Sequence, residues 1–206
     1  MNLMRRGRAG YLVTGLFSRL AKEEAEKYGK IEVLATSEAT GHDRIPDLAP
    51  VAERCRETEL DYVYICQNNT IYGTQFHELP DTGETPLVAD VSSCFLMEPI
   101  DVSRYGLIYA GAQKNGGVAG VTVVIVRDDL VGDGPAKAYC PSYMSYRRQA
   151  DAHSMMNTPN TFGIYLSGKV FRWAEAEGGL AALEARNRRK AAILYDLLDE
   201  SSVFHA

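Results

Sequence analysis

Short apolar runs alternate with longer amphipathic stretches along this chain. Runs of four to seven apolar residues, bounded by glycine, proline or polar residues, are typical of buried strands. The run at 121–127 is the richest in β-branched residues, which predicts a buried strand. The pattern predicts strands at 11–13, 31–35, 62–66, 87–91, 107–110 and 121–127.

Helical periodicity fills most of the spaces between these runs. Residues 19–28 are rich in alanine, lysine and glutamate, with Ser18 as the expected N-cap and Gly29 as the expected stop. Further helices are predicted at 51–59, 162–177 and 180–198, and a loop at 128–141. Strands that alternate with helices predict an α/β fold, a three-layer αβα arrangement with a mostly parallel central sheet covered on both faces.

Composition narrows the classes of function. With 206 residues and 46% hydrophobic residues, the chain can bury a sizeable core in one or two domains. A net charge of -5 argues against a nucleic-acid partner, and the short arginine clusters are read as solvated faces. No apolar run approaches the roughly 20 residues of a membrane span, and no signal peptide is recognisable, so we expect a cytoplasmic protein.

Cysteine and histidine spacing predicts no metal site. The four cysteines show no CxxC spacing, and reduced thiols fit best. The four histidines share no ligand spacing and are read as surface or capping residues: His42, His77, His153 and His205.

One lysine stands out among small residues. Lys114 follows the apolar run 107–110 on a turn of alanines and glycines, which leaves space beside its amine for a flat group. A lysine amine held away from water loses part of its preference for the charged form and becomes a nucleophile. Asp90 ends the run Leu-Val-Ala-Asp, where a carboxylate requires a cation or other partner. A lysine and an aspartate at neighbouring strand ends predict a pyridoxal phosphate site, in which the aspartate holds the ring nitrogen protonated. The alternative is a solvated loop lysine.

A polar segment follows the strand predicted at 62–66. Residues 67–73 read Gln-Asn-Asn-Thr-Ile-Tyr-Gly, and the carboxyl edge of an open α/β sheet is where ligand contacts gather. A plain turn is the alternative.

Five motifs in order resemble a known family. They are Asn68-Asn-Thr-Ile-Tyr-Gly73, Ala89-Asp-Val-Ser-Ser93, Pro99-Ile-Asp-Val-Ser103, Tyr109-Ala-Gly-Ala-Gln-Lys-Asn115 and Ser154-Met-Met-Asn-Thr-Pro159. Together they are similar to the phosphoserine aminotransferases, which are fold-type I, class V pyridoxal phosphate enzymes. A further match is Gly178-Gly-Leu-Ala-Ala-Leu-Glu-Ala-Arg-Asn187. The resemblance implies transamination of O-phosphoserine with 2-oxoglutarate in serine biosynthesis, with phosphohydroxythreonine of the pyridoxine pathway as a second substrate.

The resemblance also implies roles for individual residues. Lys114 would be the Schiff-base lysine and proton shuttle, and Asp90 would face the pyridinium nitrogen. Gln113 is expected at the cofactor phosphate and Thr70 near the ring hydroxyl. Phe17 stands where the family usually has a tryptophan stacked on the ring; the alternative is a core aromatic that closes the helix.

Two residues imply a homodimer with shared sites. Asn157 and Thr158 match the pair that reaches the cofactor phosphate of the other subunit. Read without the family, Asn157-Thr-Pro159 is an N-cap and helix start. Val118 replaces a proline that the family usually has after the lysine, which is expected to loosen that loop.

The resemblance predicts a chain that is shorter than the family at both ends. Residues 1–180 would form the cofactor-binding large domain without its N-terminal part, and 181–206 a long helix leading toward a small C-terminal domain that is largely absent. The family's phosphate-binding turn and its substrate-binding arginines and histidine would lie outside the chain. We therefore expect little or no turnover from these 206 residues.

Other functions stay open at this point. Within the same fold, a desulfurase or a glyoxylate transaminase is the runner-up, and Cys140 is the one loop cysteine a desulfurase could use. A second class is a non-catalytic scaffold that only dimerises. A nucleotide-binding domain is weaker, because no strand is followed by GxGxxG or a P-loop.

Overall fold

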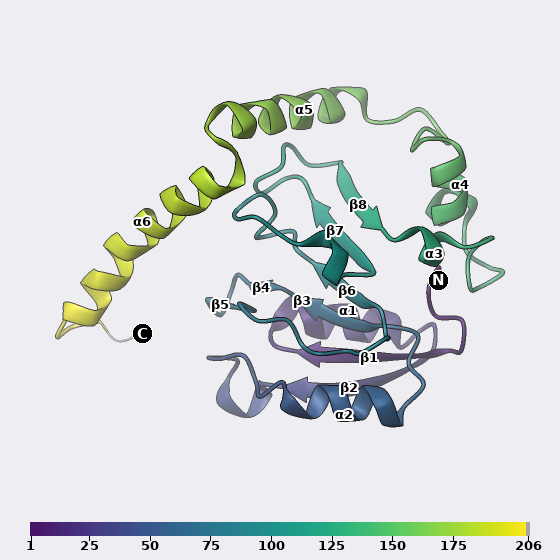
Figure 1. Cartoon of the computed structure of the whole chain (residues 1–206), viewed down its shortest axis with the longest axis horizontal. Helices are drawn as coiled ribbons and strands as arrows, with labels where there is room; N and C mark the ends of the chain where they lie inside the picture. The colour runs from purple at the N-terminus through teal and green to yellow at the C-terminus, as the bar shows by residue number, and fades with distance from the viewer. Residues whose placement is uncertain (205–206) are drawn as a thin grey trace.

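The computed structural model describes residues 1–204 and contains one six-stranded sheet (Figure 1). The strands run in the order β2-β1-β3-β6-β7-β8. The first five are parallel, and β8 is antiparallel to β7. This confirms the expected α/β class with a mostly parallel sheet. The strands are β1 (Arg8–Val13), β2 (Lys30–Thr36), β3 (Val63–Cys66), β6 (Leu87–Asp90), β7 (Leu107–Gly111) and β8 (Thr122–Val126).

Two helices cover opposite faces of the sheet. On one face, α1 (Leu16–Ala25) packs through Ala25 with the buried residues Tyr11, Tyr64 and Val88. On the other face, α2 (Ala49–Glu57) packs through Val51. The buried strand residues on that face alternate along each strand with the residues that face α1. Period-two alternation of this kind sends neighbouring side chains to opposite faces, and it produces two separate cores.

The strand order reverses between β1 and β3, and this reversal marks the place for a ligand crevice at the carboxyl ends of these two strands. The chain leaves β1, forms β2 on one side, and returns to form β3 on the other side of β1. In open α/β sheets, ligands bind outside the carboxyl ends of strands at this reversal of strand order. The segment after β3 continues as a small hairpin of β4 (Asn68–Asn69) and β5 (Thr74–Gln75).

The second half of the chain is less compact. It contains α3 (Asp128–Val131), α4 (Tyr146–Asp151), α5 (Thr161–Ala176) and α6 (Gly179–Glu200), with short 3-10 helices at Glu38–Thr40, Val102–Arg104 and Ser142–Met144. Figure 1 shows α5 passing over the strands β7 and β8 and α6 extending away from the sheet. Many large apolar side chains on these two helices are exposed, among them Phe162, Tyr165, Trp173, Ile193, Leu194 and Leu197.

Four sequence predictions of local structure are wrong. Ser18 is not the N-cap of α1, which begins after Gly15. The strand at 121–127 is not buried, because β8 is an edge strand with one neighbour, and Ile125 is 43% exposed. Asn157-Thr-Pro159 is not the N-cap and helix start of its alternative interpretation, because α5 begins at Thr161, next to the predicted start at 162, and is capped by Asn160. The segment 128–141 opens with the short helix α3 and is not all loop.

No helix among residues 1–204 is long and apolar enough to cross a membrane. His205, one of the four histidines, lies outside the described residues. The division into 1–180 and 181–206 stays a prediction.

Candidate active site

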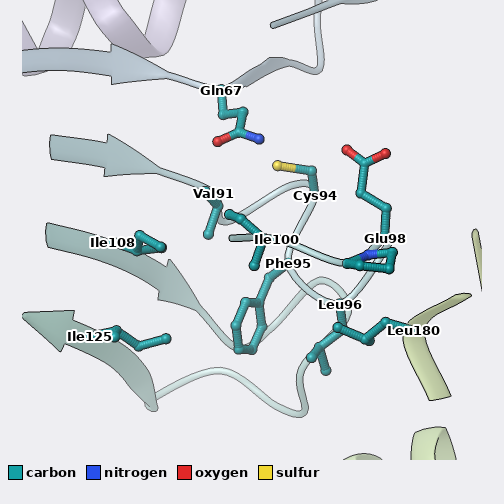
Figure 2. Close-up of a pocket in the computed structure, with 11 residues that line it drawn as sticks. Gln67, Val91, Cys94, Phe95, Leu96, Glu98, Ile100, Ile108, Ile125 and Leu180 are labelled. Carbon is teal, nitrogen blue, oxygen red and sulfur yellow. The ribbon is translucent and has the colours of Figure 1, made fainter. Parts of the chain in front are cut away.

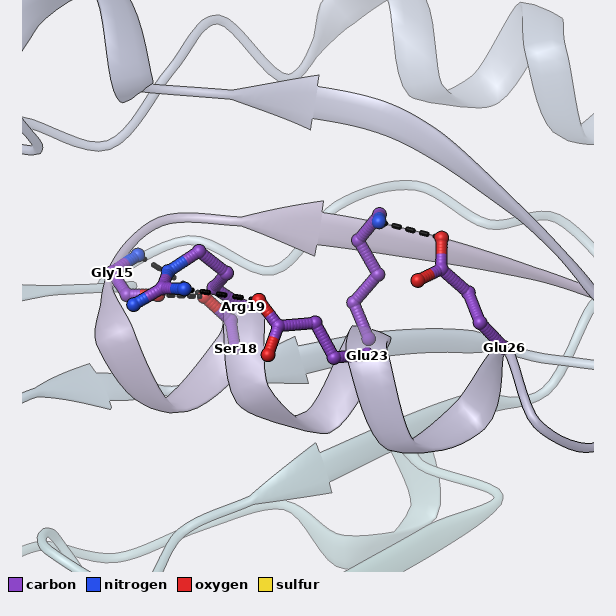
Figure 3. A network of polar contacts seen from close by, with 6 residues as sticks. Gly15, Ser18, Arg19, Glu23 and Glu26 are labelled. Atoms are coloured by element: carbon purple, nitrogen blue, oxygen red, sulfur yellow. Dashed lines mark hydrogen bonds and ion pairs between the residues drawn. The ribbon is translucent and has the colours of Figure 1, made fainter.

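The start of α1 is fixed by a serine inside its first turn. The Ser18 hydroxyl accepts a hydrogen bond from the backbone N–H of Gly15 and donates to the Gly15 carbonyl (Figure 3). It also accepts from the backbone N–H of Thr14. Two ion pairs along the exposed side, Arg19–Glu23 and Lys22–Glu26, support the helix at four-residue spacing. The turn after β1 is therefore held by three hydrogen bonds of Ser18, and it places Phe17 at the carboxyl edge of the sheet.

Phe17 and Thr70 flank the amine of Lys114. The Nζ atom lies 5.5 Å from the centre of the Phe17 ring and donates a hydrogen bond of 3.3 Å to the Thr70 hydroxyl. Phe17 is 43% exposed, so it is not the core aromatic of the alternative interpretation. The Lys114 side chain is itself exposed, and the expectation that it is withdrawn from water is wrong, because its turn stands above the sheet edge.

A hydrogen-bond relay holds Thr70 in this place. Asn69 is buried between the two segments: its Oδ1 accepts from the Thr14 hydroxyl at 3.1 Å, and its Nδ2 donates to the Thr74 hydroxyl at 3.1 Å. The relay ties the end of β1 to the β4–β5 hairpin. The polar segment 67–73 is therefore more than a turn, because its hydrogen bonds connect two strand ends.

Asp90 is half-buried at the end of β6 and is stabilised by a serine, not by a cation. Its Oδ1 accepts hydrogen bonds from the Ser92 backbone N–H at 2.9 Å and from the Ser92 hydroxyl at 2.6 Å. The same hydroxyl accepts from the Gly111 backbone N–H at 3.0 Å. Ser92 therefore joins the carboxylate to the end of β7, three residues before Lys114.

The amine and the carboxylate lie on the same side of the sheet. Asp90 alternates with Ala89 and so shares a face with Val88, the face that α1 covers. The Lys114 amine lies over Phe17, which belongs to α1. Cys66 lies in register with Asp90 and is within electrostatic reach of both charges.

The cysteines near the site are buried thiols that hold their protons. Burial raises the pKa of the Cys66 thiol to about 12, and the Asp90 charge adds to this while the Lys114 charge opposes it. Burial also raises the pKa of Cys94 to about 12. Neither thiol is a candidate nucleophile.

The remaining predicted residues are not all brought together. Gln113 is exposed on the lysine turn, and its amide folds against Gly111, where an added Cβ would lie 2.5 Å from Oε1. Asn157 and Thr158 are exposed in the connection between α4 and α5. Among the hydrogen bonds of residues 1–204, none joins these two side chains to Lys114 or Asp90.

A separate cavity lies on the other face of the sheet. Figure 2 shows it between Val91, which follows β6, the strand residues Ile108 and Ile125, and the loop that contains Leu96. Its volume is about 60 Å³, well below the 300–1,000 Å³ of ordinary ligand pockets. It is a packing gap near the start of α6, and it does not reach Lys114.

The sequence reasoning did not single out two residues that contact or adjoin the carboxylate. One is Ser92, whose signal is the spacing Asp-Val-Ser, since an aspartate often accepts a hydrogen bond two residues on. The other is Tyr109, which is paired in register with Asp90 on the neighbouring strand. Pairing of this kind cannot be seen in a single sequence, because it depends on which strands become neighbours.

A lysine on the turn after one parallel strand, with a carboxylate ending the adjacent strand, is the arrangement of the large domain of fold-type I pyridoxal phosphate enzymes. The comparisons with known proteins are more specific. Residues 16–206 match the family model described as aminotransferase class-V, and the chain belongs to that family.

Its similar relatives are phosphoserine aminotransferases. The chain is 46% identical to the one from Paraburkholderia phymatum over 206 residues, which is 99% of this chain and 56% of the relative. It is 45% identical to one from Bacillus cereus over 96% of this chain and 53% of the relative. The chain thus spans about half the length of the curated relatives it matches.

Solved structures agree with the sequence relatives. Phosphoserine aminotransferase from Bacillus circulans subsp. alkalophilus has a TM-score of 0.90 and 40% identity, over 96% of this chain and 54% of that one. The pyridoxal phosphate-bound enzyme from Trichomonas vaginalis has a TM-score of 0.82 and 36% identity, over 97% and 55%. The fold is therefore that of about half of a phosphoserine aminotransferase chain.

Proposed function

We propose that this chain holds pyridoxal 5'-phosphate on Lys114 and serves transamination of O-phosphoserine with 2-oxoglutarate, in serine biosynthesis. Phosphohydroxythreonine of the pyridoxine pathway is a second substrate of the same chemistry. The observation that carries the proposal is the Lys114 amine, flanked by the Phe17 ring and the Thr70 hydroxyl, with the Asp90 carboxylate on the same face.

The donor set fits the cofactor. Pyridoxal phosphate needs an amine, a carboxylate for its ring nitrogen and an aromatic face, and these groups stand at one sheet edge. We assign the ring contact to Phe17, whose face is open to solvent and can stack. Thr70 is assigned to the ring hydroxyl, and Gln113 to the phosphate, where its exposed amide can turn outward.

The cofactor, when bound, supplies an electron-accepting ring that allows an amino group to pass between an amino acid and an oxo acid. Lys114 Nζ would take a proton from the substrate Cα and return it to the neighbouring cofactor carbon. The Asp90 carboxylate would keep a proton on the ring nitrogen. Ser92 fixes the direction of that carboxylate, because both of its donors meet the same oxygen.

We propose a homodimer as the assembly. Asn157 and Thr158 are then the residues that reach the phosphate of the partner's site. Support comes from their exposure and from the large apolar side chains left uncovered on α5 and α6, since exposed apolar patches of that extent mark contact surfaces. A cytoplasmic location stays a prediction.

Turnover is expected to be low when these 206 residues are assayed alone. The chain spans about half the length of its relatives. The family resemblance implies that the phosphate-binding turn and the phosphoserine-binding groups lie in the other half. Each charge-assisted hydrogen bond to a phosphate contributes about 1.5–3 kcal/mol, so losing two or three weakens cofactor binding by orders of magnitude.

Two alternative activities receive less support. Cys140 is bound through its backbone to Lys137, which in turn bonds to Met1. That places Cys140 with the N-terminal segment that precedes β1, while Lys114 follows the opposite, carboxyl end of the parallel strands. A desulfurase cysteine would have to approach the amine. Glyoxylate aminotransferases share the fold at only 14–16% identity, which favours no substrate.

Borohydride trapping tests the proposal. The chain is incubated with pyridoxal phosphate, reduced, digested and analysed by mass spectrometry, and we expect the label on Lys114. Lys169→Ala is a matched control, because the Lys169 amine also lies over an aromatic ring, that of Tyr165 at 5.2 Å, but on α5. Labelling should vanish in Lys114→Ala and persist in Lys169→Ala.

A chain that shows no cofactor absorbance band, or that is labelled equally in Lys114→Ala, refutes the assignment. The absence of any band supports the non-catalytic scaffold. Transamination of phosphoserine by these 206 residues at the rate of a family enzyme of full length would refute the low-turnover expectation alone.

A further inference from the structure

Four tyrosines lie together on the face of the sheet that α1 covers. They form two hydroxyl pairs: Tyr64 with Tyr109 at 3.2 Å, and Tyr11 with Tyr62 at 3.1 Å. The rings of Tyr11 and Tyr64 stack at 4.7 Å and join the pairs. A phenol on a buried face costs free energy unless its hydroxyl finds a partner, whereas phenylalanine packs there without that cost. The presence of tyrosine instead of phenylalanine at these positions therefore indicates that the hydroxyls have a role.

The Tyr64–Tyr109 pair has one proton more than its own hydrogen bond uses. Two phenols carry two donors, and the bond between them uses one. The Tyr64 side chain is 3% exposed, so its hydroxyl has no access to bulk water, and Tyr109 is the partner that lies nearer the sheet edge. The second proton must go to an acceptor beside Tyr109.

The candidate acceptor is the carboxylate of Asp90, whose negative charge acts on the Tyr109 hydroxyl. Asp90 and Tyr109 are directly paired residues of the parallel strands β6 and β7, and both face the α1 side. Burial raises the pKa of Tyr109, and the adjacent negative charge of Asp90 raises it further, so the phenol stays protonated and able to donate. Each carboxylate oxygen has two lone pairs, which leaves capacity for a ring nitrogen after Ser92 and Tyr109.

We propose that Tyr109, supported by Tyr64, is a positioning residue that holds the Asp90 carboxylate in the direction required by the nitrogen of the cofactor ring. The donor order runs from Tyr64 to Tyr109 to Asp90. Ser92 contacts the carboxylate from two residues further along the same segment, and Tyr109 would hold it from the neighbouring strand. The inference rests on the proposed function for its cofactor half, while the coupling between Tyr109 and Asp90 belongs to the protein alone.

A double-mutant cycle tests the coupling without cofactor. Urea unfolding of the 206-residue chain is measured for Tyr109→Phe, Asp90→Asn and the double variant. We expect the effects on the unfolding equilibrium constant to deviate from additivity by about tenfold, since contacting polar residues couple in this range. Tyr62→Phe is the matched control: it removes a hydroxyl from the other pair on the same face, and its cycle with Asp90→Asn should be additive within about twofold.

Titration with pyridoxal phosphate, followed by absorbance, tests the consequence. We expect Tyr109→Phe to raise the Kd about tenfold and Tyr62→Phe to leave it unchanged. Tyr64→Phe should act in the same direction as Tyr109→Phe and more weakly, and it replaces that variant if Tyr109→Phe does not fold.

The outcomes separate the two proposals. An additive Tyr109–Asp90 cycle overturns the inference, and so does a coupled cycle with an unchanged Kd. A wild-type chain that binds no pyridoxal phosphate overturns the proposed function, and the cycle then still decides whether Tyr109 holds the carboxylate.

Discussion

Removing the Ser92 hydroxyl should destabilise the chain, because this hydroxyl holds the Asp90 carboxylate and the end of β7 together. Ser92 makes one short hydrogen bond to Asp90, at 2.6 Å, and receives one from the Gly111 N–H, at 3.0 Å. Ser92→Ala removes both and leaves the Gly111 N–H without its partner, at a strand end that is half-buried.

The magnitude follows from these two bonds. A hydrogen bond to a charged group contributes about 1.5–3 kcal/mol, and an unsatisfied buried N–H costs about 1–3 kcal/mol. Partial exposure of both groups places the sum near the low end, at about 2 kcal/mol. For a chain of this length, such a loss lowers Tm by about 4–8 °C.

The chain contains its own control for this measurement. Residues 101–103 repeat the Asp-Val-Ser motif: the Ser103 hydroxyl donates to Asp101 at 2.6 Å, as Ser92 does to Asp90. That copy is exposed and is not bonded to a strand end. Ser103→Ala should shift Tm, followed by circular dichroism, by at most about 1–2 °C. Equal shifts for the two variants would refute the view that Ser92 works by joining β6 to β7.

Two further predictions concern titration and reactivity. The folded thiols of Cys66 and Cys94 hold their protons up to a pKa of about 12, against an ordinary value of 9.0, so their contribution to stability is complete below pH 9 and is lost as the pH rises from 9 toward 12. Urea midpoints measured from pH 8 to 10.5 should fall steadily, with a shallower fall in Cys66→Ala; a flat profile would contradict the assignment. In native labelling with a maleimide at neutral pH, the half-buried Cys140 should react first, and a Cys66 that reacts as fast as Cys140 would show that its burial is wrong.

The sequence by itself determined the order of the main elements and the identity of the chemical groups. Short apolar runs predicted all six sheet strands near their observed positions, and four of them, β1, β3, β6 and β7, are buried as expected. The helices around α1, α2, α5 and α6 were found within a few residues. Lys114 and Asp90 were found because a lysine among glycines and a carboxylate ending an apolar run are locally unusual. Such signals are local, and a single chain displays them fully.

Strand neighbours and solvent exposure were decided only by the tertiary structure. β8 has the composition of a buried strand, yet it is an edge strand, because burial depends on what lies beside it. Lys114 is exposed beside Phe17 and Thr70, which are distant in sequence. The connection of Asp90 to β7 through Ser92 and its pairing with Tyr109 exist only because β6 and β7 are neighbours. Contacts between residues far apart in the chain carry no local signature, and the packing that creates them is a property of the whole fold.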